Sequence, residues 1–120
     1  MMIVYGLKNC DTCRKALKWL DSERIAYEFR DVRKDGLDLG DVQSWLATVG
    51  ADTLINRRGT TWRQLDAADK SVTADADLAA LIVRHPAIMK RPVFVTGATG
   101  ETGASTIVGF KDEQKAALLG

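Results

Sequence analysis

The most constraining feature of this sequence is a pair of cysteines, Cys10 and Cys13, placed between two contrasting patterns. Before the pair, Met2–Tyr5 is a short apolar run closed by Gly6, which predicts a buried strand. After it, Asp11–Ser22 carries apolar residues at helical spacing. The C-x-x-C motif is therefore predicted to lie where a strand ends and a helix begins.

That position gives the two thiols different chemistry. Their spacing puts both on one helical face within a single turn, where they can reach disulfide geometry. The dipole and unpaired N–H groups of a helix N-terminus stabilise a thiolate, and Lys8, Arg14 and Lys15 add positive potential. We expect Cys10 to gain most and to be the nucleophile. Cys13 is then the thiol that resolves a mixed disulfide on Cys10.

Two other interpretations of the cysteine pair stay open. Cys10 and Cys13 could be two small buried apolar residues, although such residues have no reason to sit at this junction. A zinc site would need two further ligands, and His85 is the only histidine in the chain. We expect no metal site.

The remaining pattern predicts an α/β fold. The elements expected after the first helix are a strand at Ile25–Phe29, a helix at Leu39–Val49 capped by Gly50, a helical turn and loop at Thr53–Leu65, a helix at Asp75–Arg84, a strand at Val93–Val95, a turn at Gly97–Ser105, a strand at Thr106–Val108 and a helix at Lys111–Leu118. A β-α-β half demands a parallel crossover, and a β-β-α half adds an antiparallel hairpin. The order predicts a thioredoxin-like fold with a mixed four-stranded sheet and flanking helices. We expect a single domain over residues 1–120, with a helical insertion at about residues 37–90.

Composition narrows the class of partner. Lys plus Arg is 17 and Asp plus Glu is 16, for a net charge of +1, so there is no bulk attraction to nucleic acid or to an anionic membrane. No apolar run approaches the ~20 residues that a membrane span needs. The N-terminus lacks the basic region of a signal peptide. We expect a cytoplasmic protein whose thiols are kept reduced.

Two arginine-containing segments are further candidates for the site. They are Asn56–Gly59 and Lys90–Pro92. Arginine binds oxyanions with two parallel hydrogen bonds, and the loop before the third strand of a thioredoxin-like fold approaches the active cysteine. We interpret Arg91 as a functional residue, and for Arg58 a functional role and a surface ion pair remain equal alternatives. Surface ion pairs are the interpretation for Arg57, Lys90 and Arg63.

Four sequence blocks are specific when taken together: Tyr5–Thr12, Asp35–Leu37, Asn56–Leu65 and His85–Pro92. With these blocks the chain resembles the arsenate-reductase-like family of the thioredoxin superfamily, which contains ArsC, the regulator Spx and the YffB-type proteins. The strongest likeness is to the YffB-type branch, through Gly59–Trp62.

The resemblance assigns roles to individual residues. Cys10 falls on the family's active cysteine, and Arg91 falls on an arginine that precedes a cis proline, here Pro92. Such a proline would hold its neighbour's backbone open for an extended thiol substrate. Arg58 falls on a mid-chain arginine of the Spx and YffB types. The third oxyanion-binding arginine of the arsenate reductases falls on Gly109, and this departure predicts weak or no arsenate turnover.

The function that the resemblance implies is a thiol-dependent reductase with Cys10 as nucleophile, acting on a disulfide, a glutathione adduct or an oxyanion. Glutathione would be the cosubstrate, with no bound cofactor, and the partner would be glutathione or a thiol protein. One alternative is a redox-sensing regulator of the Spx kind that binds the RNA polymerase alpha subunit, because Cys10 and Cys13 resemble the redox switch of Spx. The other is an arsenate reductase that uses glutathione and glutaredoxin. Direct nucleic-acid or membrane binding is not expected.

Overall fold

The computed structural model describes residues 2–96 and 105–119. The chain divides into two compact units, which we call the sheet unit (Met1–Asp35 with Arg91–Gly120) and the helical unit (Gly36–Lys90). The helical insertion predicted at about residues 37–90 falls on the helical unit and stays a prediction. The single domain over residues 1–120 stays a prediction.

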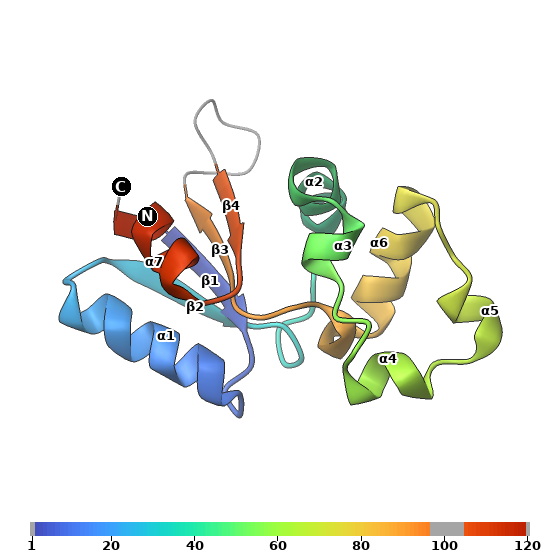
Figure 1. Ribbon diagram of the computed structural model, residues 1–120, viewed down its shortest axis with the longest axis horizontal. Helices are drawn as coiled ribbons and strands as arrows, with labels where there is room; N and C mark the ends of the chain where they lie inside the picture. The colour runs from blue at the N-terminus through green and yellow to red at the C-terminus, as the bar shows by residue number, and fades with distance from the viewer. Residues whose placement is uncertain (1, 97–104, 120) are drawn as a thin grey trace. The chain divides into compact units, whose positions relative to one another are not determined.

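Helices and strands follow the predicted order along the described residues (Figure 1). In chain order they are β1 (Met2–Gly6), α1 (Asp11–Ser22), β2 (Tyr27–Asp31), α2 (Leu39–Val49), α3 (Ala51–Leu54), α4 (Thr60–Gln64), α5 (Ala67–Lys70), α6 (Asp75–Arg84), the 3₁₀ helix η1 (Pro86–Ile88), β3 (Val93–Thr96), β4 (Ser105–Val108) and α7 (Asp112–Leu119). The sheet unit therefore holds all the named strands with α1 and α7, and the helical unit holds the other helices.

The described strands form one mixed sheet in the order β2-β1-β3-β4. β1 and β2 are parallel, so α1 is the crossover between them, and β3 is antiparallel to both β1 and β4. This topology confirms the predicted thioredoxin-like α/β fold. The predicted turn at Gly97–Ser105 falls largely on residues 97–104, which lie outside the described residues, but the antiparallel pairing of the strands on either side is confirmed.

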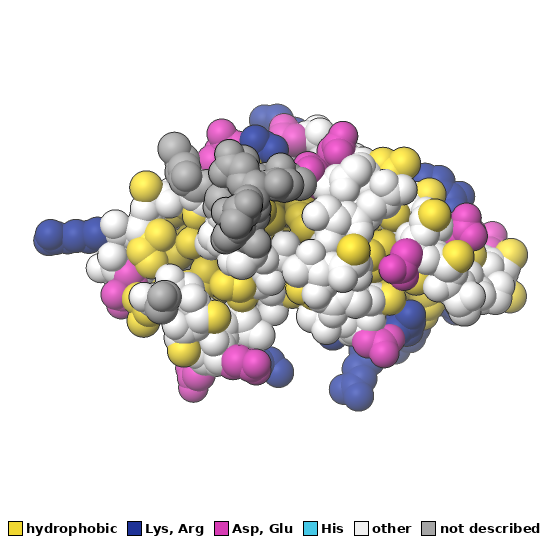
Figure 2. All heavy atoms as spheres, turned by 90° about the horizontal axis from the view of Figure 1, so that it is seen from above, with side chains coloured by type: hydrophobic (Ala, Val, Ile, Leu, Met, Phe, Trp, Pro, Cys, Tyr) yellow, Lys and Arg dark blue, Asp and Glu magenta, His cyan; other side chains and the backbone are white. Residues whose placement is uncertain are grey.

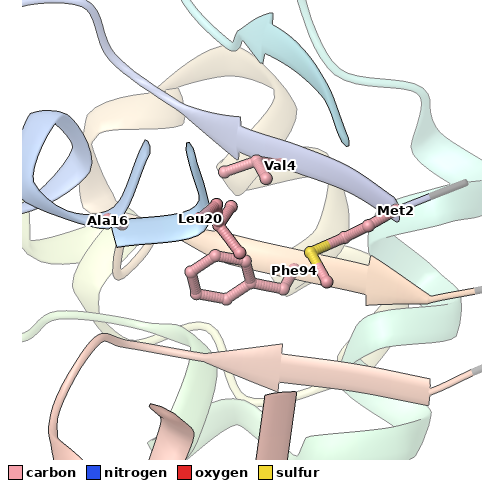
Figure 3. Packing of buried hydrophobic residues seen from close by; sticks show 5 residues of the cluster. All are labelled: Met2, Val4, Ala16, Leu20 and Phe94. Carbon is pink, nitrogen blue, oxygen red and sulfur yellow. The ribbon is translucent and has the colours of Figure 1, made fainter. Parts of the chain in front are cut away.

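The core of the sheet unit holds α1 against the sheet. Figure 3 shows the side chains of its buried cluster converging between β1, β3 and α1: Met2, Val4, Ala16, Leu20 and Phe94. Helical spacing puts Ala16 and Leu20 on one face of α1, and the register places Val4 opposite Phe94. Burial of each large apolar side chain contributes roughly 1.5–3 kcal/mol. The helix that carries Cys13 is therefore anchored to the strand that precedes it.

The helical unit is built on α2 and α6, which pack against each other. Asp38 caps the N-terminus of α2, and its carboxylate accepts the Asp41 N–H at 3.0 Å. Gly50, with φ +85, caps the C-terminus, as predicted. Trp45 from α2 and Leu81 from α6 are among its fully buried residues. Both helices have the bounds expected from their apolar spacing.

Three details of the prediction are wrong. The second strand is β2, two residues later than the predicted Ile25–Phe29, because Arg24 adopts φ +57 and the Ile25 N–H still bonds to the helix carbonyl of Leu20 at 3.0 Å. The segment predicted as one helical turn and a loop contains two helices, α3 and α4. Helix α5 was not predicted, although its N-cap Asp66 accepts the Asp69 N–H.

Charges of both signs are intermingled on the face of the molecule drawn in Figure 2, in keeping with the net charge of +1. None of the helices in the described part of the chain is long and apolar enough to cross a membrane.

Candidate functional site

Cys10 and Cys13 lie at the junction of β1 and α1, as predicted. Both are free thiols. Cys10 is the N-cap residue of α1 and is half-buried, with extended backbone angles, and its carbonyl accepts the Arg14 N–H at 3.0 Å to begin the helix. Cys13 lies in the first turn and is 1% exposed. One thiol can therefore meet a substrate, and the other is shielded behind it.

Gly6 makes room for the buried thiol. A Cβ atom at Gly6 would lie 2.6 Å from the Cys13 Sγ, closer than any real contact of this kind. Because Gly6 at the end of β1 has no side chain, Cys13 can lie directly against the strand. This is one residue of the site that the sequence interpretation missed, although a glycine within a strand is a signal of close approach.

The loop between β1 and α1 is held from two sides at Lys8. The Lys8 N–H donates to the Asp31 carboxylate at 3.3 Å, and the Lys8 carbonyl accepts from the Arg14 Nε at 3.0 Å. Asp31 is the last residue of β2 and Arg14 belongs to the first turns of α1. These contacts fix the segment that leads into Cys10.

Asp31 is a second residue that sequence reasoning missed. Besides Lys8, its carboxylate accepts the backbone N–H groups of Lys34 at 3.0 Å and Arg33 at 2.9 Å. The Lys34 N–H has the largest effect in lowering the pKa of Asp31, followed by those of Lys8 and Arg33, which outweigh the opposing effect of partial burial. An aspartate directly before a turn is the signal that could have identified it.

The two thiols have pKa values shifted in opposite directions. Burial raises the pKa of Cys13 to about 12, and the nearby Cys10 sulfur adds to the rise. Burial alone would also raise the pKa of Cys10, but the backbone N–H and thiol of Cys13 and the guanidinium of Arg91 more than offset it, so this pKa is lowered. The Cys10 thiol makes no regular capping hydrogen bond, yet the Cys13 N–H is near enough to stabilise its thiolate.

Arg91 is the cation with the largest effect on Cys10, acting by hydrogen bond and by charge. The sequence predicted that Lys8, Arg14 and Lys15 add positive potential there. Instead, Arg14 bonds the Lys8 carbonyl and pairs with Asp11 at 3.4 Å. The largest cationic effect on the thiol therefore comes from a residue distant in sequence.

The peptide bond between Arg91 and Pro92 is cis, which confirms the expectation from the resemblance. Pro92 is buried, and its carbonyl accepts the Gly109 N–H at 2.9 Å, which ties the start of β3 to the end of β4. The chain that follows Arg91 is thus held by the sheet. The structure brings Cys10, Cys13 and Arg91 together, with Pro92 as the neighbour of Arg91.

Arg58 lies in the helical unit, so its predicted place at the thiol site stays a prediction. Its side chain makes no ion pair with any described carboxylate, whereas Arg57 pairs with Asp52 at 2.5 Å, as the sequence predicted for Arg57. Within residues 2–96 and 105–119, no three His, Cys, Asp or Glu side chains lie close enough to hold a metal ion.

Comparison with known proteins places this geometry in a family. The ArsC family matches residues 5–118. The solved structure of the YffB protein is 40% identical and superposes over all of both chains with a TM-score of 0.87. An uncharacterized protein of Haemophilus influenzae is 36% identical over 114 residues, which cover 95% of each chain. The global transcriptional regulator Spx 2 of Bacillus anthracis is 25% identical over 116 residues, which cover 95% of this chain and 83% of the relative.

The match over nearly the whole chain agrees with the residues that the structure brings together. The cysteine at the start of α1, the arginine beside it and the cis proline are the features that the resemblance in the sequence implied. The chain belongs to the ArsC family.

Proposed function

We propose that this protein is a thiol-dependent reductase in which Cys10 attacks the substrate, Cys13 resolves the intermediate and glutathione is the cosubstrate. The observation that carries the proposal is the opposite shift of the two pKa values: Cys10 is the more acidic thiol, and Cys13 is held protonated by burial. A thiolate is the reactive form of cysteine, so at neutral pH the two residues have different roles.

The reaction is a sequence of thiol–disulfide exchanges. The Cys10 thiolate attacks one sulfur of a substrate disulfide, such as a mixed disulfide with glutathione, and forms a new disulfide bond while the other sulfur leaves as a thiolate. Cys13 then loses its proton to the departing thiolate and attacks the Cys10 Sγ. This attack releases the second substrate thiol and leaves a Cys10–Cys13 disulfide, so the protein has been oxidised by two electrons and the substrate reduced by two. Two molecules of glutathione then reduce the protein disulfide and leave as oxidised glutathione.

Arg91 would serve both halves of this chemistry. Its charge and hydrogen bond favour the Cys10 thiolate. A guanidinium has five N–H donors, so it can also bind a carboxylate of glutathione or another anionic substrate group. Arg58 is the second substrate ligand that we propose, from its match to the mid-chain arginine of the YffB and Spx types.

Intact mass spectrometry tests the proposal. Reduced protein is mixed with oxidised glutathione, quenched with acid and weighed. The wild type should lose two hydrogens through a Cys10–Cys13 disulfide, and Cys13→Ser should keep one glutathione on Cys10. Cys10→Ser is the matched control and should stay unmodified, because Cys13 is buried and its pKa is about 12. Equal modification of both variants would contradict the assigned roles.

A second candidate function is redox-sensing regulation of the Spx kind. It is favoured by the similarity to Spx 2 of Bacillus anthracis and by the two cysteines one helical turn apart. In this case the Cys10–Cys13 disulfide would change a surface that docks on the RNA polymerase alpha subunit. Pulldown of that subunit by the oxidised and reduced protein tests the idea, and no binding in either state would exclude it.

Arsenate reduction is the third candidate and is disfavoured at Gly109. This residue falls at the position of the third oxyanion-binding arginine of the arsenate reductases, and it adopts φ +94, a backbone conformation that a side chain strains. We expect weak or no consumption of NADPH with arsenate, glutathione and glutaredoxin in a coupled assay. Brisk turnover would make arsenate the substrate.

A further inference from the structure

The helical unit contains a pocket in which Arg58, proposed above as a substrate ligand, lies beside other cations. Its volume is about 530 Å³, which lies in the range of small-molecule sites. The lining residues come from α3 and its C-cap, the turn before α4 and the second residue after η1: Asp52, Ile55, Asn56, Arg57, Arg58 and Lys90. Half of these side chains are cationic, against one carboxylate.

Backbone pairing fixes the two segments that carry the charges. Ile55 and Met89 form an antiparallel bridge. The Asn56 N–H donates to the Ile88 carbonyl at 2.8 Å, and the Lys90 N–H donates to the Leu54 carbonyl at 2.7 Å. Lys90 is therefore held opposite Leu54, and Asn56, which begins the Asn56–Gly59 turn, is held opposite Ile88, by hydrogen bonds on both sides of the bridge.

The turn itself is closed by Asn56. Its Oδ1 accepts the Arg58 N–H at 3.2 Å, and its carbonyl accepts the Gly59 N–H at 3.3 Å. A Cβ at Gly59 would lie only 3.0 Å from the Asn56 Nδ2, so glycine permits this close packing. The backbone that presents Arg57 and Arg58 is thus organised without a ligand.

The three cations of the pocket differ in how far their charges are neutralised by protein partners. Arg57 pairs with Asp52 at 2.5 Å and lies over the Trp62 ring, 5.5 Å from its centre. The Lys90 Nζ donates one hydrogen bond, to the Asp52 carbonyl at 3.1 Å, and an ammonium group has two more donors. Arg58 makes no ion pair with a described carboxylate. The lone carboxylate is therefore occupied, and two positive charges face the pocket uncompensated.

We infer that this pocket binds a small anionic ligand through its carboxylate or phosphate oxygens, with Arg58 and Lys90 as the binding cations. A guanidinium and an ammonium on a fixed backbone match an oxyanion in charge and in hydrogen-bond donors. Arg57 stabilises one side of the pocket through its ion pair with Asp52 and its contact with the Trp62 ring. Anion binding by this pocket goes beyond the proposed reductase function: the two share Arg58, but the anion site does not require the thiols.

Nuclear magnetic resonance of the full, ¹⁵N-labelled chain tests the inference. Inorganic phosphate is titrated in one arm and succinate in the other, with the ionic strength balanced by chloride. For at least one anion, saturable shifts should be confined to the amides of Asn56–Gly59 and Lys90. Saturation by phosphate alone indicates a phosphate-bearing ligand, and saturation by succinate alone indicates a carboxylate.

Two charge variants should change the affinity for the anion in opposite directions. Arg58→Gln removes a charge-assisted contact and should weaken the anion by about tenfold or more. Asp52→Asn releases Arg57 to the ligand and should strengthen binding, a gain that misfolding cannot produce. The matched controls are Arg63→Gln and Asp77→Asn, exposed residues of the same unit outside the pocket, and should leave the affinity unchanged.

Either of two results would overturn the inference. One is a linear, non-saturating response to both anions. The other is equal weakening by Arg58→Gln and Arg63→Gln, which would indicate only a general effect of net charge. Repeating the titration with Cys10→Ser separates the inference from the reductase function, because anion binding should persist in that variant.

Discussion

Replacing Gly6 with alanine should destabilise the protein through one contact, that with Cys13. The new Cβ would lie 2.6 Å from the Cys13 Sγ, and ordinary contact begins at 3.4 Å, so the two atoms must move apart by about 0.8 Å. Cys13 is 1% exposed and cannot turn aside into solvent. Overpacking of this kind costs roughly 1–3 kcal/mol of unfolding free energy.

A double-mutant cycle isolates that contact. In a Cys13→Ala background the sulfur is gone, and the nearest remaining atoms, the Cβ of residue 13 and the Phe29 Cε1, lie at 3.4 Å. Gly6→Ala should then cost less than about 0.5 kcal/mol, as for a substitution without a clash. Urea unfolding of the four reduced proteins, followed by circular dichroism, measures the coupling. An equal cost of Gly6→Ala in both backgrounds would refute the reasoning.

Two further predictions concern charge. Arg91→Gln should raise the pKa of Cys10, because the Arg91 hydrogen bond and charge stabilise its thiolate; the pH profile of iodoacetamide alkylation should move to higher pH, and an unmoved profile would remove Arg91 from the site. Because the pKa of Asp31 is lowered in the folded state, the stability it contributes is complete above the pKa of an unfolded carboxyl and is lost as the pH falls through the folded value. Asp31→Asn should therefore lower the unfolding free energy at neutral pH, and the unfolding free energy of the variant should fall less than that of the wild type as the pH is lowered. Urea unfolding at several acidic pH values measures both effects, and an equal fall in the two proteins would count against this role of Asp31.

Much of the fold could be predicted because its main elements have strong local signals. Leu39–Val49 and Asp75–Arg84 were bounded correctly by apolar spacing, a cap and a following glycine or proline. β2 was displaced by two residues because a shift of two leaves every side chain on the same face, so the period alone cannot fix the start of a strand. Helix α5 has four residues, too few for a helical period to show.

The candidate site was predictable only where its chemistry is local. Cys10 and Cys13 were identified from the junction in which they lie. The contact of Arg91 with Cys10 joins residues far apart in the chain, and no periodicity could have given it; the expectation came from the place of the loop before the third strand in the predicted fold and from the resemblance to the family. Gly6 and Asp31 act through an empty volume and through backbone hydrogen bonds; their signals, a glycine at the end of a strand and an aspartate before a turn, do not name the residues that they contact.

The central claim is that Cys10 is an activated thiol and that Cys13 is a buried, protonated one. Alkylation of the reduced protein by iodoacetamide across a range of pH, with both cysteines quantified by peptide mapping, tests it most directly. We predict that the rate at Cys10 reaches half its maximum below the ordinary pKa of a cysteine, while Cys13 stays unmodified over the same range. A Cys10 rate that rises only at or above the ordinary value, or a Cys13 that reacts as fast, would contradict the account.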